Sequence, residues 1–374
     1  MAEVPLFRAH RSQLLPALMA AFEAVEKRSG IPILQNVLLS PDGDRLLLRA
    51  TDMTIEVETS CDLLDCQIDT AITLSGEGLR DIVRSMPEAA ELNFLLDEAR
   101  GQVRIHSGGS RFALSYLPAA GFPSISEYAS SSRFPIDLQG LIAGINRVKY
   151  AVKEDKARTY LSGTYLHPSE DGSQIVVVGC DGHNLGIYQF AARTPVSFRG
   201  ILLPIKTTAA LAKLFSDSGS DAEISVSETM AHIVCGDIKL TTKLVDGIFP
   251  DYARVIPRHN ELRAVVHAGT LNGAIARVCV VAKDTDKDAV EISLKSGTMR
   301  VSMLALDAEE AVEDIPADYG DKEISIKFHG DYLRKMLASI KTQDVLIRLS
   351  DPATGGLFQP ATETGEIYVI MPRR

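Results

Sequence analysis

The sequence predicts an α+β protein built from three similar domains, each with two helices and antiparallel sheets. At 374 residues the chain has the length of two or three domains of ordinary size. A helical pattern, a leucine with apolar residues three and four positions after it, occurs at residues 79–83, 211–215 and 333–337. Each copy follows a short strand-like run, at residues 71–74, 200–203 and 324–328. Apolar residues at i, i+3 and i+4 form one buried stripe of a helix, so the repeat indicates one unit used three times.

A second helical pattern opens each third of the chain, at residues 14–18, 138–142 and 271–275. Outside these helices, apolar and polar residues alternate, as in Val103 and Ile105, Ile224 and Val226, and Met299, Val301 and Met303. A period of two is typical of strands with one buried face. We therefore expect antiparallel strands between helices at residues 10–28, 78–87, 137–153, 206–216, 270–283 and 330–341.

A further repeat marks the ends of the first two thirds. Phe122-Pro-Ser-Ile125 corresponds to Phe249-Pro-Asp-Tyr252 at a spacing of 127 residues, and a polar connector follows each copy. The predicted domains are residues 1–128, 129–258 and 259–374.

Charge is distributed unevenly between the expected elements. The six expected helices carry 15 Lys and Arg against 5 Asp and Glu, although the whole chain has a net charge of −10. If the helices share one side of the molecule, that side is positive and suits sequence-independent attraction to a phosphate backbone. Helix surfaces often carry Lys and Arg, so charge alone leaves a purely solvated face open.

No targeting or membrane segment is expected. The N-terminus has no apolar core typical of a signal peptide, and no apolar run approaches the roughly 20 residues of a spanning helix, which predicts a cytoplasmic protein. The five cysteines are an odd number without metal-ligand spacing, so we interpret them as reduced core thiols. We expect no metal and no cofactor.

No catalytic signature is present, whether for phosphate-binding loops, dinucleotide sites, zinc proteases or serine hydrolases. The one cluster that suggests chemistry is Cys180-Asp-Gly-His-Asn-Leu185. Asp181-Gly182 follows the apolar run 175–178 and is typical of a turn, with no second ligand set nearby. A non-catalytic protein is therefore expected, and an enzyme of repeated α+β units that uses Asp181 and His183 stays as the rival.

The same residues carry a family resemblance. Asp181-Gly-His-Asn-Leu185 resembles the D-G-H-R-L motif of the bacterial DNA polymerase III beta subunits, the replicative sliding clamps. Segments 249–257, 31–36 and 368–372 are similar to the family's F-P-D-Y-x-R-V-x-P, L-P-I-L-x-N and Y-V-x-M-P. The match runs from end to end in the same order.

This resemblance implies the DNA clamp fold. Two chains would join head to tail into a ring of six domains, with twelve helices lining a hole for duplex DNA. The implied function is to confer processivity on the replicative polymerase without hydrolysis. The implied partners are duplex DNA, a second copy of the chain, the DNA polymerase III alpha subunit, the clamp loader, and other polymerases and repair proteins that present Leu/Phe-anchored peptides.

The resemblance also implies three sets of residues. The partner-peptide pocket would comprise Leu161, Cys180, Gly182, His183, Asn184, Leu185, Pro250, Val255, Val369, Met371, Pro372, Arg373 and Arg374. The DNA contacts would be Arg28, Arg158, Tyr160, Lys206 and Arg254. The dimer contact would use Phe112 and Leu114 at one end of the chain and Val280, Val281, Glu309 and Glu310 at the other.

Two departures from the family pattern lie in the implied pocket. Asn184 stands where the motif has Arg, and the chain ends Pro372-Arg-Arg374 where many members have an apolar residue after the proline. They bear on partner preference and not on fold. A clamp-like paralogue that serves as a decoy or resistance copy therefore stays open beside a replicative clamp.

Overall fold

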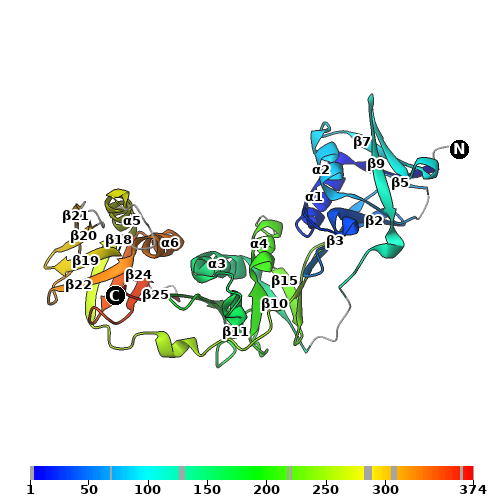
Figure 1. The fold of residues 1–374 in the computed structure, drawn as a ribbon. Coiled ribbons are helices and arrows are strands. Elements are labelled where there is room, and N and C mark those ends of the chain that lie inside the picture. Colours follow the sequence, from blue (N-terminus) through cyan, green and yellow to red (C-terminus); the bar gives the residue numbers. More distant parts are fainter. Residues whose placement is uncertain are drawn as a thin grey trace. The chain divides into compact units, whose positions relative to one another are not determined.

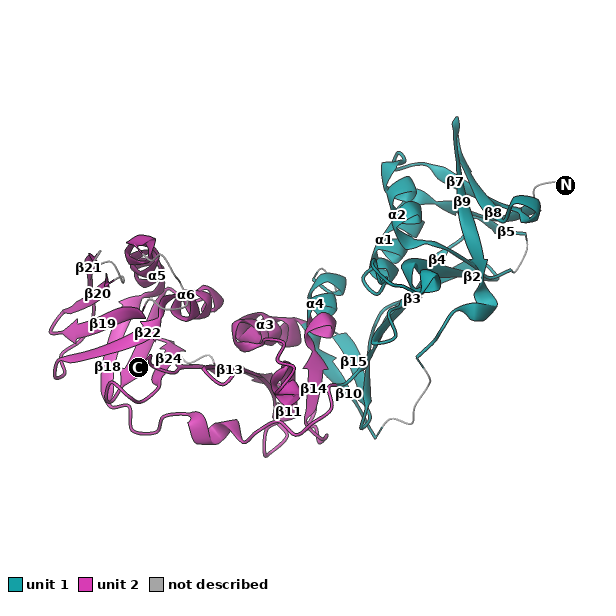
Figure 2. Ribbon diagram, viewed as in Figure 1, with its two compact units in different colours: residues 1–138, 209–244 teal, residues 139–208, 245–374 magenta. Residues whose placement is uncertain are grey.

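The computed structural model describes residues 4–67, 70–125, 131–216, 219, 221–281, 289–304, 310–362 and 365–373. The chain forms two compact units, which Figure 2 colours separately. Unit 1 comprises residues 1–138 and 209–244, and unit 2 comprises residues 139–208 and 245–374. The predicted central domain, residues 129–258, is divided between the two units. One group of its strands continues the sheet of the first predicted domain, and another continues a sheet of the third. The boundaries near 128 and 259 stay predictions.

Six α-helices occur among the described residues, as the two repeated patterns predict. They are α1 (Arg11–Phe22), α2 (Gly76–Ser85), α3 (Leu138–Val148), α4 (Ile205–Leu214), α5 (Ala268–Val278) and α6 (Gly330–Ser339) (Figure 1). In unit 1, α1 and α2 pack together and α1 lies on β3 and β4, while in unit 2, α5 and α6 pack together.

Unit 1 contains one sheet of thirteen strands in the order β10-β15-β16-β17-β4-β3-β2-β6-β9-β8-β7-β1-β5. Their bounds are β1 (Val4–His10), β2 (Asn36–Asp42), β3 (Arg45–Thr51), β4 (Ile55–Asp62), β5 (Asp65–Cys66), β6 (Ile72–Ser75), β7 (Glu91–Asp97), β8 (Gln102–Ser107), β9 (Ser110–Pro118), β10 (Ser132–Asp137), β15 (Asp221–Val226), β16 (Met230–Cys235) and β17 (Ile238–Lys243). Every pairing is antiparallel, as predicted.

Unit 2 contains an eight-stranded sheet, β14-β11-β12-β13-β25-β24-β23-β18, and a four-stranded sheet, β21-β20-β19-β22. Their bounds are β11 (Gly163–Pro168), β12 (Gln174–Cys180), β13 (Asn184–Ala191), β14 (Ile201–Pro204), β18 (Leu262–His267), β19 (Ala289–Lys295), β20 (Thr298–Leu304), β21 (Glu310–Pro316), β22 (Ile324–His329), β23 (Asp344–Leu349), β24 (Gly356–Pro360) and β25 (Glu366–Ile370). Short 3-10 turns follow α3 at Lys149–Ala151 (η4) and α5 at Cys279–Val281 (η7), and two more lie at Thr159–Leu161 (η5) and Tyr252–Val255 (η6).

The repeated stripe is confirmed as core. β6, β14 and β22 lead directly into α2, α4 and α6. The first and last apolar residue of each copy is buried: Leu79, Val83, Leu211, Phe215, Leu333 and Leu337. Ser75 is the N-cap of α2. Its hydroxyl accepts a hydrogen bond from the backbone N–H of Gly78 at 3.2 Å, which satisfies one of the free donors of the first turn.

The helices are shorter than predicted. Arg28 lies beyond the end of α1, Lys149 and Lys153 beyond α3, and Lys341 beyond α6. In α3 the last turn tightens into η4, and the chain then leaves the helix at Val152, whose backbone is extended. Of these, Lys149 and Lys341 lie within a turn of the carboxyl ends of their helices, where positive charge is favourable.

The prediction about cysteines is correct only in part. Among the described residues no disulfide forms, but only Cys61 is fully buried, and the other four are partly exposed. Burial raises the pKa of the Cys61 thiol to about 12, so it stays protonated. The other four lie at or directly after the ends of strands or helices. No helix of the described chain combines the length and apolar character needed to cross a membrane.

Candidate functional site

The turn between β12 and β13 carries the sequence motif Asp181–Leu185. One carboxylate oxygen of Asp181 accepts hydrogen bonds from the backbone N–H groups of His183, at 2.9 Å, and Asn184, at 2.7 Å. Gly182 has a φ of 89°, which favours glycine. The predicted turn is confirmed, and its aspartate serves to fold the turn.

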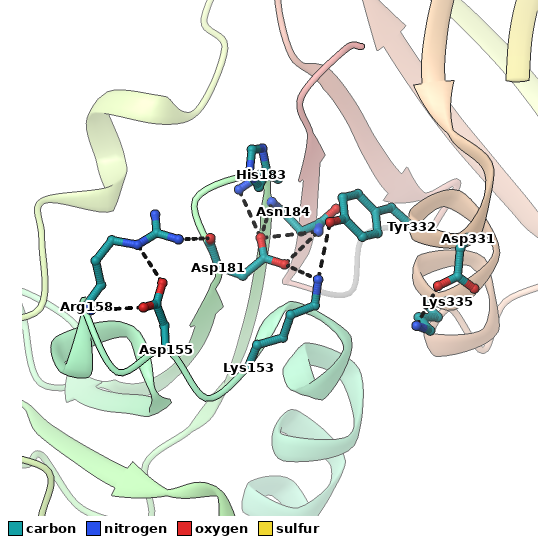
Figure 3. Close-up of polar contacts among 9 residues, drawn as sticks. All are labelled: Lys153, Asp155, Arg158, Asp181, His183, Asn184, Asp331, Tyr332 and Lys335. Atoms are coloured by element: carbon teal, nitrogen blue, oxygen red, sulfur yellow. Dashed lines mark hydrogen bonds and ion pairs between the residues drawn. The ribbon is translucent and has the colours of Figure 1, made fainter. Parts of the chain in front are cut away.

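Asp181 is buried, and two side chains compensate its charge. The Lys153 ammonium lies 3.0 Å from one carboxylate oxygen, and the Asn184 amide donates to both oxygens at 3.2 and 3.0 Å (Figure 3). Burial raises the pKa of Asp181, but the hydrogen bonds from His183, Asn184 and Lys153 outweigh it and hold the pKa below its ordinary value. The carboxylate therefore stays charged at neutral pH.

Helix α6 reaches this turn through Tyr332. The Lys153 ammonium lies 4.4 Å from the centre of the Tyr332 ring and donates to its hydroxyl at 3.3 Å. The Tyr332 ring also stacks on His183, with centroids 6.4 Å apart (Figure 3). Nothing in the local sequence pattern indicated Lys153 or Tyr332, because Tyr332 lies about 150 residues from the turn.

Asn184 faces into this network. Its side chain is 2% exposed, and its amide nitrogen is directed at Asp181. Its amide oxygen has no hydrogen-bond partner among the described residues. Asn184, which stands where the resembled motif has Arg, therefore supports the turn from inside.

Beneath the turn lies an apolar cluster. Leu161, Leu185 and Val369 are buried in it, and Cys180 packs against it partly exposed. β13 pairs with β25 so that Leu185 faces Val369, and the backbone N–H of Met371 donates to the His183 carbonyl at 2.9 Å. Residues more than 180 positions apart therefore form one apolar base.

The predicted residues around this base are exposed to different degrees. Val255 in η6 is 51% exposed and Met371 is 43% exposed. Pro250, Gly182 and His183 are also exposed, whereas Pro372 and Arg373 are partly buried. The Arg373 backbone N–H donates to the Lys327 carbonyl of β22 at 2.8 Å. Arg374 lies outside the described residues.

Ile248 is an exposed apolar residue that the sequence reasoning missed. Its side chain is 85% exposed and precedes the buried Phe249 of the cluster. A Cβ on the adjacent Gly247 would lie 2.9 Å from the Cβ of Tyr160, so this segment passes close to η5. The sequence did offer a sign of this exposure, because Ile248 directly follows Asp246-Gly247, a pair typical of turns.

The five residues predicted to touch DNA differ in their surroundings. The Arg158 guanidinium already forms hydrogen bonds within the protein, to the Asp155 carboxylate at 2.8 Å and to the Asp181 carbonyl at 3.3 Å (Figure 3). Arg254 pairs with Asp251 at 2.9 Å. Arg28 in unit 1 and Tyr160 and Lys206 in unit 2 are exposed. Of this set, the structure brings Arg158 to the turn of the site.

The residues of the predicted dimer contact are split between the units. In unit 1, Phe112 and Leu114 lie on β9, and Leu114 lies beside α2, since a Cβ on Gly78 would be 3.2 Å from it. In unit 2, Val280 is 80% exposed and Val281 is partly buried in η7, while Glu310 opens β21. Glu309 lies outside the described residues. Leu304 and Val312, on β20 and β21, add exposed apolar surface that the prediction missed.

The rival interpretation of the motif as an enzyme site gains no support from this geometry. Asp181 is used by the turn, and burial raises the pKa of the Cys180 thiol, which disfavours a thiolate nucleophile. Among the described residues, no group of three or more His, Cys, Asp and Glu side chains is placed to hold a metal ion.

Three family models match the chain in order. They are the N-terminal domain of the DNA polymerase III beta subunit over residues 6–126, its central domain over 136–251 and its C-terminal domain over 253–374. The predicted threefold organisation is therefore confirmed.

Relatives match over nearly the whole length. The chain is 33% identical over 369 residues to the beta sliding clamp of Caulobacter vibrioides, covering 97% of this chain and 98% of that protein. It is 31% identical to the beta sliding clamp of Pseudomonas aeruginosa, covering 98% and 99%. The crystal structure of the Pseudomonas aeruginosa clamp bound to griselimycin superposes with a TM-score of 0.94 at 30% identity, over 99% of this chain and 100% of that chain.

Proposed function

Because this chain belongs to the family of bacterial DNA polymerase III beta subunits, the sliding clamps, we propose that its partners dock on the apolar cluster under the Asp181 turn. As a clamp, the protein is a non-catalytic processivity factor that acts with DNA, the polymerase and a second copy of itself. One observation carries the docking proposal: exposed Met371 lies beside the buried apolar base. The hydrogen bond from the Met371 backbone N–H to the His183 carbonyl holds it there.

The chemistry of this surface suits a short peptide with Leu and Phe anchors. Leu161, Leu185 and Val369 offer a dry base, and exposed Met371 can adapt its shape to different guests. Gly182 leaves room for the Arg158 guanidinium at the edge of this surface, since a Cβ there would lie 2.6 Å from it. Few anchors and little buried area imply roughly micromolar affinity for an isolated peptide, which allows partners to exchange.

The chain end adds charge beside this base. Arg373, and Arg374 beyond the described residues, would favour peptides that also carry acidic groups. Rising salt would weaken that preference, because exposed charges are screened. Asn184 offers no cation here, so the preference of this clamp for acidic guests would depend on its C-terminus.

The proposed guests are the polymerase alpha subunit, the clamp loader, and other polymerases and repair proteins, all in the cytoplasm. We assign the remaining predicted residues by the same family match. Arg28, Arg158, Tyr160, Lys206 and Arg254 would contact the DNA backbone without reading sequence. Phe112 and Leu114 of one chain would meet Val280 and Val281 of the next, with Glu309 and Glu310 at the rim.

The docking proposal is tested by removing residues 371–374 and titrating a Leu/Phe-anchored peptide against the dimer. We expect the affinity for the peptide to fall at least tenfold, because the truncation removes the exposed apolar side chain of Met371 and both arginines. Met371→Asp is the companion variant, since it keeps the backbone bond to His183. Val234→Asp, which changes a 37% exposed residue of unit 1, is the matched control. Unchanged affinity in both variants, with the dimer intact, would place the site elsewhere.

A replicative clamp and a paralogue are separated by processivity on primed circular DNA with a clamp loader. A replicative clamp lengthens the products, and a decoy copy does not. Retention on circular but not on linear DNA checks the closed ring, since a ring slides off free ends.

A further inference from the structure

The segment that carries Pro250 and Val255 of the proposed peptide site has little regular structure of its own. Its turn, η6, belongs to no sheet of the described chain. The backbone hydrogen bond from Arg254 to the Asp251 carbonyl is long, at 3.4 Å. Short 3-10 turns have poor hydrogen-bond geometry and add little rigidity by themselves. The position of this wall of the site therefore depends on contacts made by side chains.

Strand β11 offers two aromatic side chains to this segment (Figure 1). Tyr165 and His167 are two residues apart, so they lie on the same face of the strand, with ring centroids 5.1 Å apart. The Tyr165 ring stacks on Phe249, with centroids 4.5 Å apart and planes 7° from parallel. A Cβ on Gly200 would clash with the Tyr165 hydroxyl, so Gly200 leaves the room that this ring needs. The stack fixes the start of the segment.

His167 fixes the next part of the segment through a hydrogen bond. Its Nδ1 lies 2.7 Å from the Pro168 carbonyl, which can only accept, so Nδ1 carries the proton. In the neutral ring Nε2 is then an acceptor, and it lies 2.8 Å from the Tyr252 hydroxyl. Burial lowers the pKa of His167 and raises the pKa of Tyr252 to about 12. At neutral pH the imidazole therefore stays neutral and the hydroxyl stays a donor.

Tyr252 connects this contact to the peptide site. It is the first residue of η6, and Val255 is the last. Tyr252 and Ile256 pack, partly buried, against the apolar cluster beneath the Asp181 turn. The edge of the Tyr252 ring also meets Phe249, with centroids 6.3 Å apart. A tyrosine held both at its ring and at its hydroxyl has little freedom, so the short turn that it begins is held as well.

We propose that His167 and Tyr252 are positioning residues of the peptide site, because the hydrogen bond between them holds η6 with Pro250 and Val255 in place before a guest arrives. This inference rests on the proposed docking function and deepens it, with the same Leu/Phe-anchored peptide as the guest. Neither residue belongs to the pocket that the family match implies. A wall that is already ordered does not have to be ordered when the peptide binds, so less of the binding free energy is lost.

The test is the affinity of the dimeric full-length protein for the Leu/Phe-anchored peptide, measured by fluorescence anisotropy. His167→Phe and Tyr252→Phe each remove one member of the bond and keep an aromatic ring. Each should lower the affinity about three- to tenfold, the effect of one lost hydrogen bond. The double variant should bind no more weakly than either single variant, because the same bond is lost. His167→Gln offers an amide oxygen near the position of Nε2 and should recover most of the affinity.

A bond of the same kind in unit 1 supplies the matched control. His232 Nδ1 lies 2.7 Å from the Thr241 hydroxyl, across the pairing of β16 with β17. His232→Phe and Thr241→Val each remove one member of this bond. They should lower the Tm by an amount similar to that of the unit 2 variants and leave the peptide affinity unchanged. Circular dichroism checks that every variant is folded, and either single variant of a pair suffices if the other is not.

An affinity that falls only in the His167 and Tyr252 variants, and returns with His167→Gln, supports the proposal. Unchanged affinity in these variants, an equal fall in the unit 1 controls, additive losses in the double variant, or no recovery with His167→Gln would overturn it. The truncation of residues 371–374 separates this result from failure of the docking proposal. If only the truncation weakens peptide binding, the positioning role is wrong and the docking site stands. If neither change weakens it, the peptide docks elsewhere and both proposals are wrong.

Discussion

Two strand pairings join segments that are about 180 residues apart, one in each unit. In unit 1, β4 pairs with β17, so that Val57 faces Leu240 and Glu56 faces Thr241. In unit 2, β13 pairs with β25, so that Leu185 faces Val369 and Tyr188 faces Glu366. Both pairings are antiparallel and extend a sheet across a predicted domain boundary.

We call the pairing of β4 with β17 the unit 1 joint and that of β13 with β25 the unit 2 joint. The two joints are stabilised by different kinds of ion pair. Beside β4 and β17 the ion pairs are exposed, as between Arg45 and Asp237 at 2.8 Å. Beside β13 and β25, Arg147 and the Tyr368 hydroxyl both donate to buried Glu366, at 2.6 and 2.7 Å. Burial and this carboxylate raise the pKa of Tyr368, which stays a donor.

This difference indicates which of the two joints can carry a binding surface. The unit 2 joint ends in the Asp181 turn and the C-terminal residues, so its apolar base continues to the surface at Met371. Its buried polar network holds the two strands in one register, while Met371 beside the buried base stays exposed. The unit 1 joint also has a buried carboxylate, Glu56, which accepts a hydrogen bond from the backbone N–H of Ile125 at 3.0 Å.

The largest expected effect comes from breaking the buried network. Glu366→Ala leaves Arg147 and the Tyr368 hydroxyl without their acceptor, and loss of one partner from a buried ion pair costs about 3–5 kcal/mol. Urea unfolding of the dimer measures this loss. Arg45→Ala in unit 1 is the control, since both members of its pair are exposed and no resolvable loss is expected. Similar losses in the two variants would erase the distinction between the joints.

Asp181→Asn should cost less and depend on pH. The variant loses the charge that holds Lys153 and Asn184, and hydrogen bonds to charged groups contribute about 1.5–3 kcal/mol. The pKa of Asp181 is lowered in the folded protein, so its stabilisation is present above the ordinary carboxylate range and is lost as pH falls through the lowered pKa. The gap in urea midpoint between wild type and variant should therefore be full at pH 7 and shrink below about pH 4. A gap independent of pH would contradict this account.

Gly182→Ala and Gly236→Ala compare a turn in each unit. Both glycines have positive φ, 89° and 56°, so each substitution should cost roughly 1 kcal/mol of backbone strain. A Cβ at Gly182 would lie 2.6 Å from the Arg158 guanidinium, whereas nothing lies within 4 Å at Gly236. Only Gly182→Ala should also displace Arg158 and weaken peptide binding, which titration of both variants checks. Equal peptide affinities would show that Arg158 has no part in shaping the site.

The smallest expected effect is at Glu56. Burial raises the pKa of this carboxyl in the folded protein, so its contribution is most favourable below the ordinary pKa and is lost as pH rises through the raised value. This is the opposite sign to Asp181. Glu56→Gln keeps an acceptor for Ile125 and should stabilise the protein at pH 7 by about 0.5 kcal/mol or less. A loss of stability at pH 7, in thermal unfolding at several pH values, would show that the charge is needed.

The sequence determined the parts of the fold that depend on near neighbours. The stripe that includes Leu79 and Val83, with its copies, predicted three of the helices, because positions three and four apart share a helix face. Asp181-Gly182 predicted its turn, because an Asp side chain and a glycine of positive φ are local features. Chain-long motifs indicated the family, and with it the residues of the candidate site.

The tertiary structure alone decided what those parts do together. No local period specifies that β13 chooses β25, that Arg147 finds Glu366, or that Tyr332 reaches Lys153, since each contact joins residues more than 170 positions apart. Sequence patterns report which residues share a face of one element, but the packing of those faces decides which charges are buried with a partner and which remain open to a ligand.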